Sequence, residues 1–152
     1  MNLYFRMFYV LVASVFKPRL PAGQATSELI LLTLPNDLDI NLHVNNGRYL
    51  TLCDLSRVDF FIRTGLARVM FMRGWMPVVA EHTMTYRKPL GVFRKFKATM
   101  RLTHWDEKHF FMTHIFSIDG KIIAEGTSKG VVRGKEGVVA PANVISAILA
   151  AR

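Results

Sequence analysis

Cysteine is almost absent from this sequence: Cys53 is the only one among 152 residues. A single cysteine excludes a disulfide framework within the chain and is typical of proteins from a reducing compartment. Because Cys53 lies in a strongly apolar stretch, we expect it to be a packing residue and not a nucleophile. We therefore expect other side chains to carry the chemistry of this chain.

Acidic residues are also scarce, with 11 Asp and Glu against 20 Lys and Arg, which gives a net charge of +9. This excess predicts an acidic partner such as coenzyme A phosphates, an acidic acyl carrier protein or anionic lipid. No zinc-finger, RNA-recognition or helix-turn-helix pattern accompanies the charge, so we expect no nucleic-acid partner. Six basic residues cluster in one segment, which is also compatible with a solvated strand face: Arg87, Lys88, Arg94, Lys95, Lys97 and Arg101.

Long hydrophobic runs are missing as well. The apolar run from Met7 to Phe16 has ten residues, whereas a membrane-spanning helix needs about twenty. Pro18 and Pro21 follow and end any helix there. We expect residues 1–24 to form an apolar helical segment that lies on the domain, on a partner subunit or, through residues 1–17, on a membrane surface. The expected location is the cytoplasm, with membrane association left open.

Hydrophobic periodicity predicts an α+β domain over residues 25–152. Apolar residues occupy more than one face of residues 46–64, which indicates a buried helix ended by Gly65. After Gly74 the period changes to two, which predicts strands. Asp119-Gly120 is a two-residue hairpin signal. The expected elements are a strand over 25–35, helices over 46–64 and 66–73, strands over 78–87, 95–104, 110–118 and 121–133, and a helix over 141–150.

The chain is more apolar than a typical soluble monomer, with 51% hydrophobic residues and a mean hydropathy of +0.22. Burial in an oligomer, a lipid-binding cavity or membrane contact would each account for this surplus.

Residues 37–49 hold the densest group of chemically versatile side chains. Their sequence is Asp37-Leu-Asp39-Ile-Asn41-Leu-His43-Val-Asn45-Asn46-Gly47-Arg48-Tyr49. An extended backbone would send alternate side chains to one face, so the two carboxylates, the amide and the imidazole would converge. Asn45 or Asn46 is a good N-cap for the following helix, whose first N–H groups form an anion site. These groups are what attack on an acyl carbonyl requires.

The same segment resembles the active-site motif of hotdog-fold thioesterases, both plant acyl-ACP thioesterases and the 4-hydroxybenzoyl-CoA thioesterase group. Further likeness lies in the residues Ser56-Arg57-Val58-Asp59 and Tyr86-Arg87-Lys88-Pro89. The later layout also resembles an animal thioesterase-like family with a hydrophobic N-terminus. The resemblance implies a hotdog fold, in which a curled antiparallel sheet surrounds a central helix, and a homodimer or homotetramer with sites at the subunit boundary.

The resemblance also assigns roles to residues of the motif. Asp39 matches the catalytic carboxylate, which acts as general base or as nucleophile. Asn41 matches an Asn that holds water or substrate, and His43 matches the active-site His. Asp37 is expected to be structural, through turn hydrogen bonds. Asn45, Asn46 and Gly47 are expected to cap the helix and to offer N–H groups to the oxyanion.

Other candidates rest on less. Tyr49 and Arg48 are expected to orient the motif or the substrate. The phosphates of the substrate or an acidic carrier are expected to bind Arg87, Lys88, Lys95, Lys97 and Arg101. Glu81 is a possible second acid, because Thr85 stands where plant enzymes have a Glu. The four histidines His82, His104, His109 and His114 show no metal-ligand spacing, so we expect no metal. Coenzyme A or phosphopantetheine is expected as part of the substrate, not as a cofactor.

The sequence therefore predicts an enzyme of fatty acid metabolism that hydrolyses an acyl-CoA or acyl-ACP thioester to a free acid and a thiol. An alternative is a non-catalytic, membrane-associated hotdog protein that binds acyl groups or lipid. A hotdog hydratase is a weaker rival, because those enzymes carry Asp-x-Asn-Pro-x-His and this chain lacks the Pro and one residue of that spacing.

Overall fold

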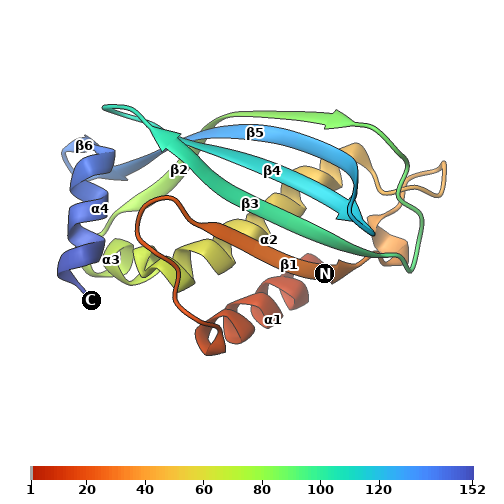
Figure 1. Ribbon diagram of the computed structural model, residues 1–152, viewed down its shortest axis with the longest axis horizontal. Coiled ribbons are helices and arrows are strands. Elements are labelled where there is room, and N and C mark those ends of the chain that lie inside the picture. Colours follow the sequence, from red (N-terminus) through yellow and green to blue (C-terminus); the bar gives the residue numbers. More distant parts are fainter. Residues whose placement is uncertain (1) are drawn as a thin grey trace.

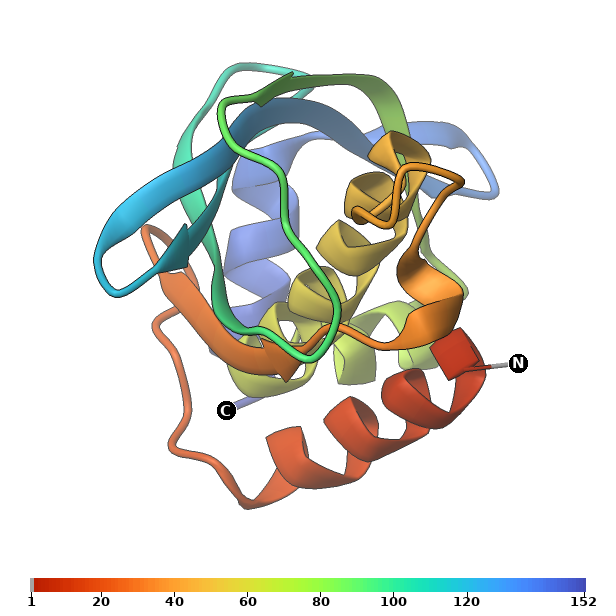
Figure 2. The ribbon, with the colours of Figure 1, turned by 90° about the vertical axis from the view of Figure 1, so that its right-hand side faces the viewer.

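A curled antiparallel sheet surrounds one long helix in the computed structural model, which describes residues 2–152 (Figures 1 and 2). The strand order is β1-β3-β4-β5-β2, and β6 pairs with β5. The elements are α1 (Asn2–Phe16), β1 (Thr26–Leu32), the 3-10 helix η1 (Pro35–Asp37), α2 (Asn46–Thr64), α3 (Leu66–Arg73), β2 (Met76–Tyr86), β3 (Lys95–Trp105), β4 (Phe110–Ile118), β5 (Lys121–Gly134), β6 (Gly137–Val139) and α4 (Pro141–Ala150). The α+β hotdog architecture expected from the sequence is confirmed.

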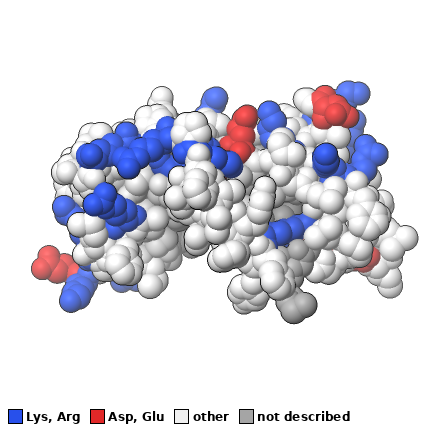
Figure 3. Space-filling view, turned by 90° about the horizontal axis from the view of Figure 1, so that it is seen from below, with Lys and Arg blue, Asp and Glu red and all other residues white. Residues whose placement is uncertain are grey.

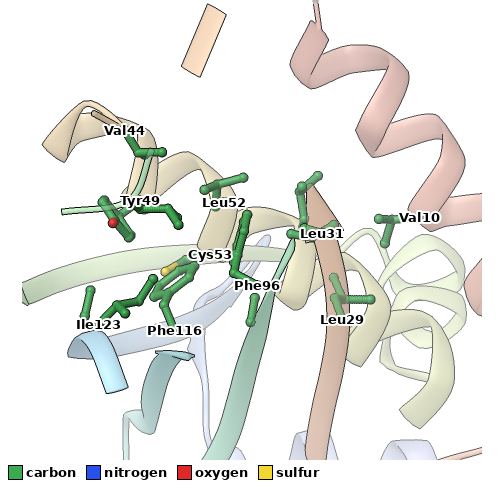
Figure 4. Packing of buried hydrophobic residues seen from close by; sticks show 14 residues of the cluster. Val10, Leu29, Leu31, Val44, Tyr49, Leu52, Cys53, Phe96, Phe116 and Ile123 are labelled. Atoms are coloured by element: carbon green, nitrogen blue, oxygen red, sulfur yellow. The ribbon is translucent and has the colours of Figure 1, made fainter. Parts of the chain in front are cut away.

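The core lies between α2 and the concave face of the sheet. Leu52, Cys53 and Leu55 of α2 are fully buried. Alternate residues of β3 point toward this helix, because successive side chains of a strand leave opposite faces. Figure 4 shows side chains of α2, β1, β3 and β4 meeting in one cluster, with Phe96 and Phe116 beside Cys53. The helix that the periodicity predicted to be buried is therefore the centre of the fold.

Glycine is required where β2 crosses β5. A Cβ placed on Gly126 would come within 2.1 Å of the Thr83 carbonyl oxygen, and one on Gly130 within 3.3 Å of the Val78 oxygen. Atoms cannot approach to 2.1 Å without bonding, so Gly126 is required for the two backbones to pair, whereas a side chain in place of Gly130 would need its neighbours to shift by a few tenths of an ångström. The two backbones therefore approach each other closely at both glycines.

The two edges of the sheet differ. At one edge β1 lies near α1, which runs along the side of α2 that faces away from the sheet (Figure 2). At the other edge β2 is exposed over almost its whole length. None of the helices within residues 2–152 is long and apolar enough to cross a membrane.

Candidate active site

The segment that joins η1 to α2 is a turn, and the extended conformation expected for it is wrong. The backbone N–H of Asp39 donates to the His43 oxygen at 2.9 Å, and that of Leu42 donates to the Asp39 oxygen at 3.0 Å. Leu42 has a φ of 60°, in the left-handed region. Local hydrogen bonds of Asp39 favour this turn: its Oδ1 accepts the backbone N–H of Asn41 at 2.9 Å.

Asp37 lies on the other side of this turn, away from the candidate catalytic residues. It is 2% exposed, and its carboxylate binds the guanidinium groups of Arg6 and Arg48. Its second oxygen accepts the backbone N–H of Leu34, and its carbonyl oxygen accepts that of Asn45. The carboxylate has no capacity left for a substrate, and the structural role expected for Asp37 agrees with these contacts.

Although the turn is not extended, it brings Asp39, Asn41 and His43 to the same cavity. This cavity has a volume of about 320 Å³, within the range usual for ligand sites. The turn supplies one wall, the first turns of α2 supply the second, and the segment after β2 supplies the third. Its other lining residues are Val44, Asn46, Tyr49, Tyr86, Arg87, Lys88, Pro89 and Leu90.

The N-terminus of α2 opens into this cavity through Asn46. Asn45 is the N-cap: its side-chain oxygen accepts the Gly47 N–H at 2.8 Å, and its carbonyl oxygen accepts the Arg48 N–H at 2.8 Å. Among the described residues nothing accepts the backbone N–H of Asn46. Of the three residues considered for the oxyanion, Asn46 alone lines the cavity, while Asn45 and Gly47 face a neighbouring hollow with Arg48.

Two tyrosines form the inner wall of the cavity. The rings of Tyr49 and Tyr86 lie 5.2 Å apart, and the Tyr86 hydroxyl donates to the Asn46 carbonyl oxygen at 2.9 Å. Burial, together with the neighbouring Tyr86, raises the pKa of Tyr49 to about 12. Both phenols therefore stay neutral near pH 7. Tyr86 was absent from the candidates drawn from the sequence, although its place at the end of a strand before Arg87 and Lys88 was a usable signal.

The candidate basic residues divide into two groups. Arg87 and Lys88 line the cavity, and Arg87 is also paired with Glu125 on β5. Lys95, Lys97 and Arg101 alternate with the buried residues of β3 and therefore lie on the outer face of the sheet. There Lys97 lies 3.5 Å from Glu28, and Arg101 donates to Thr26. The cavity and the outer face of the sheet are thus separate basic surfaces.

Glu81 does not lie in this cavity. Its side chain is exposed on β2, where its nearest charged partner is Lys129 at 3.5 Å. Asp39 is the only carboxylate among the residues that line the cavity in the described part of the chain.

A second polar group lies deeper, between α2 and the sheet, and sequence spacing did not reveal it. Ligand atoms of Cys53, His82 and His114 lie within 4.8 Å of one another. Arg57 donates to Nδ1 of His82 at 3.2 Å, and Ser128 bonds Nε2 of His114 at 2.8 Å. The positive guanidinium in contact with His82 disfavours a cation there.

Burial controls the ionisation of this group. It lowers the pKa of His114 to about 3, helped by the charge of Arg57, and it lowers the pKa of His82 for the same two reasons. It raises the pKa of Cys53 to about 12. At neutral pH Cys53 is therefore a protonated thiol in the core, which agrees with a packing role.

Further along α2 lies a second, apolar cavity of about 210 Å³. It is lined by residues of α2, α3 and α4 and of strands β2, β3, β4 and β5. Asp54 and Arg57 are its charged residues, and they form an ion pair. The remaining wall is almost wholly hydrophobic, with Val58, Phe61 and Ile148 among its residues.

Comparison with known proteins places this geometry in a family. The family model described as the thioesterase-like superfamily matches residues 33–149, which include the turn, α2 and the sheet after it. The chain belongs to the thioesterase-like superfamily. Protein THEM6 of Xenopus laevis is 39% identical over 85 residues, which cover 56% of this chain and 41% of that relative. The chain thus matches less than half of the length of this relative.

Solved structures of thioesterases share the fold. The probable thioesterase YbaW of Escherichia coli superposes with a TM-score of 0.74 at 19% identity, over 81% of this chain and 96% of that one. The gentisyl-coenzyme A thioesterase BH1999 superposes with a TM-score of 0.68 at 20% identity, over 80% of this chain and 98% of that one. At these identities the likeness shows a common fold.

Proposed function

We propose that this member of the thioesterase-like superfamily hydrolyses an acyl thioester of coenzyme A or of acyl carrier protein. The observation that carries the proposal is the convergence of Asp39, Asn41 and His43 on one cavity at the N-terminus of α2. A carboxylate, an amide, an imidazole and an unpaired helix N–H group are sufficient for acyl transfer to water.

In the proposed reaction the thioester carbonyl oxygen points at the Asn46 N–H. Charge that develops on this oxygen is stabilised by that N–H and by the partial positive charge of the helix end. Asp39 can remove a proton from the attacking water, and the tetrahedral intermediate then collapses to the acid and a thiol that takes up this proton. Alternatively Asp39 attacks the carbonyl, which releases the thiol and leaves an acyl–Asp39 anhydride, and water then hydrolyses this anhydride to the acid and the free carboxylate. Asn41 holds Asp39 through its backbone N–H, and its amide and the His43 imidazole position water and the leaving group.

The apolar cavity supports an acyl group as the part of the substrate that is recognised. Its hydrophobic wall lies along α2, the same helix whose first turn lines the polar cavity. Hydrocarbon binds such a wall through the hydrophobic effect. Phe61 and Val58 line it, so replacing Val58 with Trp fills part of the space. That variant should lose activity toward long acyl chains and keep it toward short ones.

The two basic surfaces suggest how the carrier could be distinguished. Lys88 lines the cavity, so Lys88→Glu should raise KM for acyl-CoA by repelling its phosphates. Lys95, Lys97 and Arg101 lie on the outer face, where a protein carrier can dock. If acyl carrier protein is the substrate, reversing their charges should raise its KM in a salt-dependent way and spare kcat.

A homodimer through the exposed β2 edge is part of the proposal. Unpaired backbone groups along a long edge strand invite pairing with a second copy, and Met76, Val78 and Val79 expose apolar side chains there. Sedimentation at micromolar concentration should show a dimer or a dimer of dimers. A stable 17.3 kDa species would contradict this assembly.

The test of the activity is direct. Purified protein is incubated with acyl-CoA substrates of increasing chain length, and the released thiol is detected. We expect turnover of acyl-CoA of at least one chain length. If acyl groups are hydrolysed only when they are attached to acyl carrier protein, the carrier is acyl carrier protein and not coenzyme A.

A second candidate function is acyl or lipid binding without hydrolysis. The observation that favours it is that Asp39 stands alone as the carboxylate of its cavity, with Glu81 outside. Binding of acyl-CoA by calorimetry without release of thiol from any substrate would support this alternative over hydrolysis.

A further inference from the structure

One side of α1 carries a continuous apolar surface. Among the side chains of α1 that the structure describes, the eight exposed large ones are all hydrophobic or aromatic: Tyr4, Phe5, Phe8, Tyr9, Leu11, Val12, Val15 and Phe16. At 3.6 residues per turn they fall within an arc of about 160° around the helix axis. No charged residue lies among them. A single surface leucine is ordinary, but a contiguous patch of this kind marks an interaction site.

The opposite side of α1 is fixed to the domain by buried and partly buried polar contacts. Arg6 binds Asp37 with nitrogen-to-oxygen distances of 3.1 and 2.9 Å. Ser14 donates to Asp59 at 2.7 Å, and Lys17 binds the same carboxylate at 3.0 Å. Because these contacts are in the packed side, the apolar side cannot turn inward to join the core. The fold therefore holds it outward.

We propose that this apolar side of α1 docks on an anionic membrane surface, with the helix lying in the plane of the interface. The helix has 15 residues, so it is about 22 Å long and lies along a bilayer without spanning it. Phe5, Phe8 and Val12 enter the acyl boundary, and Tyr4 and Tyr9 keep their hydroxyl groups near the headgroups. This docking does not depend on thioester chemistry.

Charge favours a membrane over a second copy of the chain. Figure 3 looks onto the α1 side, where a large uncharged area is bordered mainly by Lys and Arg side chains, with a few Asp and Glu among them. Arg19 follows the helix, is exposed, and makes no hydrogen bond or ion pair among the described residues. A second copy docked through the same face would bring two such basic borders together, whereas anionic lipid attracts them. The exposed β2 edge proposed for dimerisation lies across the sheet from β1 and α1.

Docking through α1 would also orient the candidate active site. Arg6 connects the buried side of α1 to Asp37, which lies two residues before Asp39. The cavity would therefore sit at a fixed height above the lipid, where amphipathic acyl thioesters concentrate.

The test is flotation of the full chain with vesicles of phosphatidylcholine, with and without phosphatidylserine. The parent is expected to float with the vesicles that contain phosphatidylserine. The double variant Phe8→Glu with Val12→Glu should lose at least tenfold in binding. Arg19→Gln should lose about fivefold, which corresponds to about 1 kcal/mol for one basic residue near the surface. Leu149→Glu, at an exposed leucine of α4, is the matched control and should bind like the parent.

Three results would overturn the proposal. The folded parent could fail to float with either vesicle, or the α1 variant could float as well as the Leu149 control. The α1 variant could also change the oligomeric state in sedimentation while the parent binds no lipid, which would make this surface an interface between copies. Both α1 substitutions are at exposed positions, and thermal unfolding checks that the variant is folded.

Discussion

The carboxylate of Asp37 is bound by the guanidinium of Arg6 across 31 positions of sequence. Arg48, in the first turn of α2, binds the same carboxylate at 3.2 Å. Asp37 therefore joins three parts of the chain: the N-terminal helix, the turn that carries Asp39, and the start of the central helix. A charge buried to this degree is stable only while its partners remain in place.

Replacing Arg6 with Met should therefore destabilise the fold. The variant keeps most of the apolar stem and leaves the buried carboxylate with Arg48 as its one cationic partner, so we expect a loss of about 3 kcal/mol. Urea unfolding measures it. Arg19→Met removes an exposed arginine of the same segment and should have almost no effect. Equal stability of Arg6→Met and the parent would show that this ion pair does not anchor α1.

Asp59 should make stability depend on pH in the acid range. Burial alone would raise its pKa, but hydrogen bonds from Ser27, Ser14, Lys17 and Arg63 outweigh burial and lower it below 3.8. As the pH is lowered, Asp59 is therefore protonated at a higher pH in the unfolded chain than in the folded chain. The stability that Asp59 contributes is complete above about pH 4 and is lost as the pH falls further.

The variant Asp59→Asn should be less stable at neutral pH by about 3–5 kcal/mol, because it leaves buried donors and cations without their acceptor. Its stability should also fall less steeply than that of the parent below pH 4. Asp119→Asn, in the exposed hairpin, is the matched control. A parallel fall of Asp59→Asn and the parent with pH would contradict the lowered pKa.

His114 should make the stability of the fold depend on pH in a higher range than Asp59 does. Its pKa is lowered to about 3 in the folded state, whereas an unfolded histidine has a pKa near 6.5. Between these two pH values His114 is protonated in the unfolded chain and neutral in the folded chain. The stability of the fold therefore falls as the pH drops from about 6.5. His114→Gln can keep a hydrogen bond to Ser128 and should flatten this slope, while the exposed His104→Gln should not. Titration of His114 near pH 6 by NMR would contradict the account.

Periodic apolar residues predicted most of the fold. The helix over 46–64, the four later strands and the hairpin at Asp119-Gly120 all occur within two residues of their expected bounds. The short strand β6 was missed, because three residues are too few for a periodic signal. The turn at Asp39 was also missed, because alternating side chains occur in turns as well as in strands, and the hydrogen bonds that form this turn are local.

The candidate site could be predicted only where its residues are close in sequence. Asp39, Asn41 and His43 were found together because five positions contain all three. Tyr86 at the end of β2 and Leu90 four residues after it reach the same cavity, and that meeting depends on sheet topology. The contact of Cys53, His82 and His114 depends on it too. Sequence spacing carries no information about such contacts between distant elements.

The most direct test of the account is steady-state thioester hydrolysis by Asp39→Asn, measured beside its thermal unfolding. The substitution keeps the shape of the side chain and its hydrogen bond from Asn41, but removes its basicity. If Asp39 activates or replaces the attacking water, turnover should fall by about a hundredfold or more, with folding and assembly unchanged and Asp119→Asn fully active. A folded Asp39→Asn that turns over like the parent would contradict the catalytic assignment.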